Sequence, residues 1–373
     1  MRATQAIIHL DNLRNNIREI KKYTGNRTKI CMAVKANGYG HGSVPIAMTA
    51  QTEGVEYFGI ATVDEGVELR KAGITAGIIL LSLPLPGEIK DLISNSISCV
   101  AADESICEQL NTAAGEMNTR AGAHLKIDTG MGRIGCSPEE APVLAEKIAA
   151  MPNLILEGIF THFPAADIED HGFTRNQIRL FQNAVAEIRK KSINPGIIHA
   201  ANSGAILGHP DSYFDMVRPG ILLYGYYPSR YQRNHLNLKP VMELKSRVVF
   251  IKEVPRGTGI SYGLTYTTDS RTTIATIPVG YGDGYSRLLS NKSEVLINGR
   301  LFPVSGTICM DQLMVDIGNN GNVELYNEAV LFGPDPAGPN AEDLADLIGT
   351  IPYEITCGIN KRVPRIYVDS GTD

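Results

Sequence analysis

Residues 30–42 read Ile-Cys-Met-Ala-Val-Lys-Ala-Asn-Gly-Tyr-Gly-His-Gly. The five apolar residues that open this stretch predict a short buried strand, and Lys35 follows that strand directly. A lysine in this place either extends its amine to solvent or serves as a buried nucleophile of lowered pKa, as Schiff-base chemistry requires. The glycine-rich residues 39–42 favour the second interpretation, because glycines let a ligand approach the backbone closely.

The same pattern recurs up to about residue 225: a short apolar stretch, a turn and then a helical periodicity. The predicted strands are residues 30–34, 58–61, 78–81, 98–101, 123–128, 156–161, 197–201 and 214–217. The clearest predicted helices are residues 63–72, 103–115, 138–150 and 174–191. Strands that alternate with helices predict a parallel sheet, and eight such units favour an α/β fold closed into a (β/α)8 TIM-like barrel. A doubly wound open sheet is the alternative.

A second domain follows after about residue 235, where short strand patterns replace the long helical periodicities. The predicted strands there are residues 241–254, 272–278, 293–297, 300–308, 313–317, 329–332 and 363–368, with one helix at residues 341–348. Short strands between Gly, Asn, Asp and Pro turns are typical of an antiparallel sheet. We therefore assign residues 1–232 to a cofactor-binding barrel and residues 233–373 to a mainly antiparallel β domain, with the boundary in the polar stretch 228–239.

Composition excludes several classes of protein. The 373 residues carry 35 Lys+Arg and 40 Asp+Glu, a net charge of −5, so the strongly basic footprint of a nucleic-acid binder is absent. The sequence has no apolar run long enough to cross a membrane and no pattern of a signal peptide at its start. The six cysteines form no CxxC pair, so we expect no metal site and no disulfide framework, and a cytoplasmic location.

Polar residues gather at the ends of five predicted strands. In a βα barrel these ends surround one mouth, where active sites lie. The residues are Lys35, Lys126, Arg133, His162, His199, Ser203 and Arg218. On the fifth strand His124, Lys126 and Asp128 share one face, so Lys126 points into the site beside Arg133. Two cations so close need an anion, or a modification that makes one. Each histidine, taken alone, is more often a satisfied core residue than a catalyst.

A phosphate site is the second candidate feature of this mouth. Ser203 begins a helix and Gly220-Ile221 follows the eighth strand, and in barrels the loops after the last two strands often bind phosphate. An ordinary helix cap and a turn glycine are the alternative. Phosphate donors opposite a Schiff-base lysine suggest a phosphorylated aldehyde, pyridoxal phosphate.

These residues resemble the alanine racemases. Residues 33–42 are similar to the cofactor-attachment signature of that family, and further family motifs follow in the family's order. They are KIDTGMGRIG (126–135), THF (161–163), HAANS (199–203), VRPGI (217–221), SYG (261–263), GYGDGY (280–285), CMDQ (309–312) and PYE (352–354). The resemblance spans Lys35 to Tyr353 and implies a βα barrel followed by a β domain.

The resemblance also implies a reaction with two bases. Lys35 would bind pyridoxal phosphate and act as one base, and Tyr262, reaching in from the partner subunit of a homodimer, would be the other. His162 would hydrogen-bond to Tyr262. The reaction would interconvert L- and D-alanine and supply D-alanine for peptidoglycan.

The remaining roles follow from the same resemblance. Arg218 would contact the pyridine nitrogen, backed by His199. Lys126 would be carbamylated, and Arg133 and Met310 would orient the substrate carboxylate. The phosphate would be held by Tyr39, Ser203, Gly220, Ile221 and Tyr353.

The sequence departs from the family's pattern at two positions. Thr307 replaces an arginine that many members pair with a second one, here Arg287, so the substrate corridor is expected to be less positive. Pro352 stands where some relatives have serine, but Tyr353 is kept and narrows the pocket toward alanine. A serine or broad-specificity racemase of the same family remains the alternative.

Two more distant rivals are less well supported. Decarboxylases of this architecture use an acidic residue at the pyridine nitrogen and a cysteine from the partner subunit. This sequence has Arg218 and Tyr262 in these roles, which argues against a decarboxylase. A non-enzymatic pyridoxal-phosphate carrier built on a lone barrel would need neither the β domain nor a second base.

Overall fold

Eight parallel strands close into a barrel in the computed structural model, which describes residues 2–319 and 322–369. The strands are β2 (Lys29–Ala33), β3 (Tyr57–Ile60), β4 (Gly77–Leu80), β5 (Ile97–Ala101), β6 (Ala121–Lys126), β7 (Leu154–Phe160), β8 (Ile197–Asn202) and β9 (Met216–Arg218). The last strand pairs with the first, with Ile30 opposite Val217, which closes the ring. The barrel prediction is confirmed, and the open-sheet alternative is wrong.

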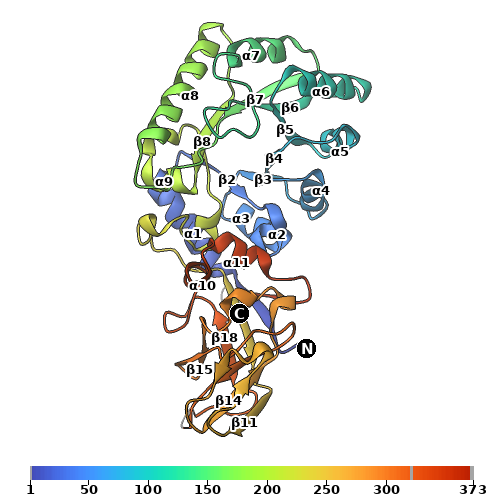
Figure 1. Cartoon of the computed structure of the whole chain (residues 1–373). Coiled ribbons are helices and arrows are strands. Elements are labelled where there is room, and N and C mark those ends of the chain that lie inside the picture. The colour runs from blue at the N-terminus through green and yellow to red at the C-terminus, as the bar shows by residue number, and fades with distance from the viewer. Residues whose placement is uncertain (1, 320–321, 370–373) are drawn as a thin grey trace.

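Helices cover the outside of the barrel (Figure 1). They are α1 (Leu10–Thr24), α3 (Ser43–Thr52), α4 (Val63–Lys71), α5 (Ile89–Ser94), α6 (Glu104–Glu116), α7 (Ala141–Ala150), α8 (Gly172–Lys190) and α9 (Ser203–Gly208). Helix α8 shows why they form: it buries Ile178, Phe181, Val185 and Ile188, which recur at three and four residues along one face. All four helices expected from the periodicity are present.

The described residues of the β domain form three sheets. The six-stranded sheet runs β16 (Arg300–Pro303), β15 (Glu294–Ile297), β18 (Glu328–Phe332), β10 (Met242–Arg247), β1 (Gln5–His9), β19 (Arg365–Val368). A three-stranded sheet holds β11 (Phe250–Val254), β14 (Thr272–Ile277) and β17 (Leu313–Asp316), and β12 (Gly259–Ile260) pairs with β13 (Tyr266–Thr267). The pairs are antiparallel, except that β1 and β19 run parallel.

Three details differ from the sequence-based expectations. The expected strand 241–254 is two strands, because the chain leaves one sheet after Arg247 and enters another at Phe250. The expected strand 300–308 ends at Pro303, after which Val304 pairs with Val315 of the three-stranded sheet. Residues 5–9 fall within the expected barrel domain, where no strand was expected, but they form strand β1 between β10 and β19, with Ala6, Ile7 and Ile8 buried. The boundary at residue 232 stays a prediction.

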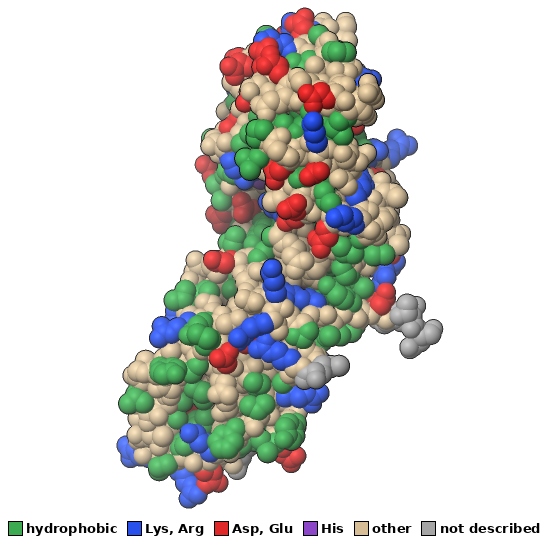
Figure 2. Space-filling model, turned by 90° about the vertical axis from the view of Figure 1, so that its right-hand side faces the viewer, with side chains coloured by type: hydrophobic (Ala, Val, Ile, Leu, Met, Phe, Trp, Pro, Cys, Tyr) green, Lys and Arg blue, Asp and Glu red, His purple; other side chains and the backbone are tan. Residues whose placement is uncertain are grey.

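The barrel and the β domain form two lobes that meet near the middle of the molecule (Figures 1 and 2). Helix α10 (Ala341–Ile348) and helix α11 (Pro352–Gly358) lie there, and α11 packs on α2 (Lys35–Tyr39). The contact requires glycine at position 40, since a Cβ there would lie 2.1 Å from the Thr356 carbonyl oxygen. This packing brings Tyr353 to the mouth. In the described residues no helix is long and apolar enough to span a membrane.

Candidate active site

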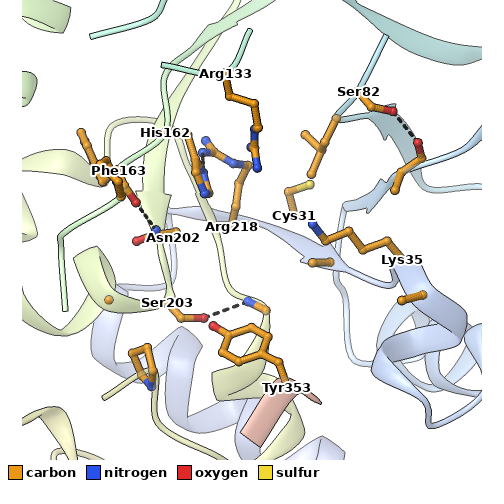
Figure 3. A pocket seen from close by; sticks show the side chains of 18 of the residues that line it. Cys31, Lys35, Ser82, Arg133, His162, Phe163, Asn202, Ser203, Arg218 and Tyr353 are labelled. Atoms are coloured by element: carbon orange, nitrogen blue, oxygen red, sulfur yellow. Dashed lines mark hydrogen bonds between the residues drawn. The ribbon is translucent and has the colours of Figure 1, made fainter. Parts of the chain in front are cut away.

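A cavity of about 720 Å³ lies at the C-terminal ends of the barrel strands. Nine of the predicted site residues line it: Lys35, Tyr39, Lys126, Arg133, His162, Ser203, Arg218, Gly220 and Tyr353. Figure 3 shows Arg133, His162 and Arg218 gathered on one side, Lys35 on the other, and Ser203 with Tyr353 below. Two guanidinium groups, those of Arg133 and Arg218, therefore face the Lys35 amine across the cavity. The hydroxyl groups of Ser203 and Tyr353 lie on the floor of the cavity.

Lys35 is presented by an unusual turn. Ala36, Asn37 and Tyr39 have φ values of 52°, 55° and 50°, a left-handed conformation that costs an L-residue about 1–2 kcal/mol. The carboxylate of Glu65 offsets part of this cost, because it accepts a 2.7 Å hydrogen bond from the Ala36 N–H. The turn thus places Lys35 at the cavity just beyond the end of β2.

The pKa of Lys35 is lowered. Burial is the main cause and the charge of Arg133 adds to it, while Glu65 opposes the shift. A lower pKa leaves more of the amine neutral near physiological pH, and the neutral amine is the nucleophilic form.

Arg218 is buried at the end of β9 and is held on several sides. It donates hydrogen bonds to the carbonyl oxygens of Thr161 (2.7 Å) and Ala200 (3.0 Å), and to Nδ1 of His162 (3.2 Å) and of His199 (3.0 Å). Burial lowers its pKa to about 10, against a rise caused by Cys31, so the guanidinium remains a cation at neutral pH. This network holds a buried positive charge in one fixed orientation.

Both histidines beside Arg218 are kept neutral. The pKa values of His162 and His199 lie well below the ordinary value, first because both rings are buried and then because Arg218 is adjacent. His162 lines the cavity, whereas His199 lies behind Arg218 and stacks on Phe160 with ring centroids 4.9 Å apart.

Lys126 is the second amine of the site. It is only 2% exposed, and its Nζ donates to the carbonyl oxygen of Ile127 at 3.0 Å. Burial and the charge of Arg218 lower its pKa to about 8, although Asp128 opposes the shift. Near physiological pH Lys126 is still mostly protonated, but its neutral fraction is far larger than that of an ordinary lysine.

Arg133 is held by a loop that closes on Asp128. The carboxylate of Asp128 accepts hydrogen bonds from the N–H groups of Gly130, Met131 and Gly132 at 2.8–3.2 Å. Burial disfavours the ionised carboxylate, but these bonds outweigh it and lower the pKa of Asp128. The loop thus fixes Arg133 at the edge of the cavity.

Hydrogen-bond donors converge on the floor of the cavity. The N–H of Gly220 donates to Ser203 Oγ at 3.0 Å, and the ring of Tyr39 lies 5.5 Å from that of Tyr353. Burial raises the pKa of both tyrosines, so their hydroxyl groups stay protonated and able to donate. A Cβ at Gly220 would lie 2.7 Å from the Tyr39 hydroxyl oxygen, so a larger residue would have to displace the Tyr39 side chain. Ile221, the next residue, is buried. The donor set suits a small anion.

Two predicted residues lie away from this cavity. Tyr262 and Met310 belong to the β domain, are 72% and 52% exposed, and do not line the cavity of their own chain. The loop of Tyr262 is anchored by Thr307, whose Oγ1 donates to the Tyr262 carbonyl oxygen at 2.8 Å. Thr307 is buried, and the expected effect of this residue on a substrate corridor stays a prediction.

The sequence analysis missed one residue that shapes the site. Glu65 binds Ala36 and also accepts from the N–H of Ala61 at 2.8 Å. The signal was present, because Thr62 and Glu65 form a capping box at the start of α4. The capping box predicts a helix start but not the contact with the turn after Lys35.

Comparisons with known proteins agree along the whole chain. The profiles described as "Alanine racemase, N-terminal domain" and "Alanine racemase, C-terminal domain" match residues 8–228 and 241–367. The chain is 51% identical to the alanine racemase of Treponema denticola over 99% of both chains, and 43% identical to that of Desulfovibrio desulfuricans over 99% of both.

A solved structure agrees equally well. The alanine racemase of Clostridium difficile 630 has a TM-score of 0.94 and 40% identity, covering 99% of this chain and 97% of that one. The named relatives are alanine racemases and give no support to the serine or broad-specificity alternative. The chain thus belongs to the alanine racemase family, a family of isomerases.

Proposed function

We propose that this protein interconverts L- and D-alanine as a homodimer, with pyridoxal phosphate bound covalently at Lys35. The proposal is carried by one observation: the two residues assigned as bases lie in different places. Lys35 lines the cavity, whereas Tyr262 lies exposed on the β domain outside the cavity of its own chain. A second copy can supply the missing tyrosine.

The residues of the cavity fit this cofactor. Tyr39, Ser203 and Tyr353 offer hydroxyl donors for the phosphate, and Gly220, whose N–H donates to Ser203 Oγ, would lie beside it with Ile221. Lys35 offers an amine of lowered pKa for the aldehyde carbon. When bound, the cofactor withdraws electrons from the α-carbon of the amino acid, which allows its proton to leave.

Arg218, backed by His199, would meet the pyridine nitrogen. A guanidinium only donates hydrogen bonds and does not give up its proton, so that nitrogen would stay unprotonated. Electron withdrawal is then weaker, and side reactions such as transamination are limited. The hydrogen bonds of Arg218 to Thr161 and Ala200 keep the donor from turning away.

Racemisation requires proton removal on one face of the α-carbon and proton return on the other. Lys35 would serve one face and Tyr262 of the second copy the other, and His162 would hydrogen-bond to the hydroxyl group of that tyrosine. Arg133, and Met310 of the second copy, would orient the substrate carboxylate. Removing the positioned proton acceptor on one face would cost about 10²–10⁴-fold in rate.

Lys126 would carry a carbamate. Its neutral amine can attack carbon dioxide and lose a proton, giving an anion between the cations Arg218 and Arg133. That anion would replace the repulsion between Lys126 and the two arginines with attraction and would fix Arg133 for the substrate.

The direct test is a screen of L-amino acids with chiral analysis of the products. The proposal expects D-alanine from L-alanine, with serine a poor substrate, and a yellow protein whose cofactor borohydride fixes to Lys35. Racemisation of serine faster than alanine, or label on Lys126, would contradict it. We place the enzyme in the cytoplasm, in keeping with its six free cysteines, where its D-alanine would supply peptidoglycan.

A further inference from the structure

A column of polar side chains crosses the interior of the barrel, where layers of Val, Ile and Leu are usual. Arg218 Nη1 lies 3.0 Å from His199 Nδ1, and His199 Nε2 lies 3.0 Å from His124 Nδ1. His124 Nε2 is buried without a hydrogen-bond partner and lies 3.9 Å from a carboxylate oxygen of Glu157. The column therefore leads from the cavity to a partly exposed carboxylate.

The direction of these hydrogen bonds follows from Arg218. A guanidinium only donates, so His199 Nδ1 accepts and its proton sits on Nε2. That Nε2–H donates to His124 Nδ1, which puts the proton of His124 on its Nε2, facing Glu157. Both rings are neutral, since burial and then Arg218 lower the pKa of His124 to about 3 and that of His199 well below its usual range.

Glycines in the neighbouring strands make room for this column. A Cβ at position 158 would lie 2.4 Å from His124 Nδ1, and a Cβ at position 122 would lie 2.4 Å from Glu157 Cδ. The pairing of β6 with β7 also shifts register between Ala123 and His124. Both side chains therefore occupy spaces that the backbone keeps open for them.

Before any carbamate forms on Lys126, the groups that accept hydrogen bonds from Arg218 are neutral. In the part of the chain that the structure describes, its hydrogen-bond partners are two carbonyl oxygens and two neutral imidazoles. A buried cation without an anion is costly. Glu157 lies at the far end of the column, where Ser98 Oγ donates to its Oε2 at 2.5 Å.

We propose that Glu157 is a positioning residue for Arg218 and acts as its remote counter-ion through His124 and His199. The carboxylate draws the Nε2–H of His124 toward itself. This makes His124 Nδ1 a better acceptor for His199, and His199 in turn a better acceptor for Arg218. The two hydrogen bonds from Arg218 through His199 to His124, with the charge of Glu157 3.9 Å beyond them, thus fix the donor that would face the pyridine nitrogen. Only this last consequence rests on the proposed function.

The test is ¹⁵N–¹H spectroscopy of labelled histidines in the apoprotein, which needs no activity. Glu157→Gln keeps the size of the side chain but removes its charge, so the Nε2–H signals of both His124 and His199 should move upfield. Ser98→Ala frees the carboxylate oxygen that Ser98 occupies, so the same two signals should move downfield. Glu146→Gln, an exposed carboxylate on α7 paired with Lys191, should move neither.

Opposite shifts at both rings establish the coupling, because a merely structural role for Glu157 would not reverse sign with Ser98→Ala. Any of three outcomes would overturn the proposal. They are unshifted His199 signals, shifts of the same sign in both variants, and a proton on Nδ1 of either ring. If the spectra behave as expected but the holoenzyme does not racemise alanine, the proposed function fails and the column stands. If both hold, Glu157→Gln should lower kcat and raise the rate of transamination relative to racemisation.

Discussion

The N–H of Ala36 donates a 2.7 Å hydrogen bond to Glu65, so the residue after Lys35 is tied to the first turn of α4. This bond holds a left-handed turn made partly of non-glycine residues, a conformation that the chain would otherwise leave. Helix α4 therefore fixes the position of the amine that we assign to the cofactor.

Glu65→Ala should loosen that turn. A hydrogen bond to a charged group contributes about 1.5–3 kcal/mol, and the free energy of unfolding should fall by about this much. Titration with pyridoxal phosphate should show weaker binding in Glu65→Ala than in Glu65→Gln, which keeps one acceptor oxygen. Asp64→Ala, on the same helix turn, is the control. Equal cofactor affinity in all four proteins would show that the turn does not depend on Glu65.

Lys126 should make the stability of the apoprotein rise with pH. Its pKa is about 8 in the fold against 10.5 ordinarily, so between these values the unfolded chain binds more protons than the folded one. The rise from this group should approach about 3 kcal/mol. Urea unfolding at pH 7 to 10 in buffers free of carbon dioxide measures it.

Lys126→Met removes this group while keeping its length. The pH-dependent rise should shrink in that variant, and should be unchanged in Lys147→Met, which alters an exposed lysine paired with Glu104. Parallel curves for the wild type and Lys126→Met would mean that Lys126 titrates normally in the fold.

Thr307 should matter through its hydroxyl group, which anchors the Tyr262 carbonyl oxygen. Thr307→Val keeps the shape but leaves that carbonyl without its partner, at a cost of about 1–3 kcal/mol. Tyr262 would then be less well placed, and kcat for alanine should fall. Thr307→Ser, which retains the hydroxyl, should stay close to the wild type. A loss of the same size in both variants would point to the methyl group instead.

Mixing Lys35→Ala chains with Tyr262→Phe chains should restore activity. Each hybrid dimer would contain one site with Lys35 and Tyr262 both intact. Half of the dimers in an equal mixture are hybrids with one of two sites working, so about a quarter of wild-type activity should return. Lys35→Ala mixed with the double variant should stay inactive. No recovery after subunit exchange has been verified by mass would contradict a site shared between subunits.

Much of the fold could be predicted because its signals are local. Each barrel strand is an apolar run next to a turn, and helices such as α8 repeat their buried residues at helical spacing. Strand β1 could not be assigned to its sheet, because its partners Met242 and Arg365 lie more than two hundred residues away in the chain.

The candidate site, like the fold, could be predicted only where its signals are local. Motif residues such as Lys35 and Arg218 could be named from the sequence, but their partners could not. Contacts like that of His124 with His199 join residues 75 positions apart and depend on the closed barrel. The left-handed φ of Ala36 is set by Glu65 and not by any preference of alanine.

Lys35 and Tyr262 would serve opposite faces of the substrate, and hydrogen exchange in deuterated water measures each face separately. Tyr262→Phe removes one base but keeps the aromatic ring, and Lys35 should still bind the cofactor. By resemblance to the family, Tyr262 would take the proton from L-alanine and Lys35 would take it from D-alanine. The variant should therefore still exchange the α-proton of D-alanine, followed by mass spectrometry, while exchange from L-alanine falls by about 10²–10⁴-fold. Equal residual exchange from the two enantiomers would contradict the assignment, even if the overall rate of racemisation dropped as expected.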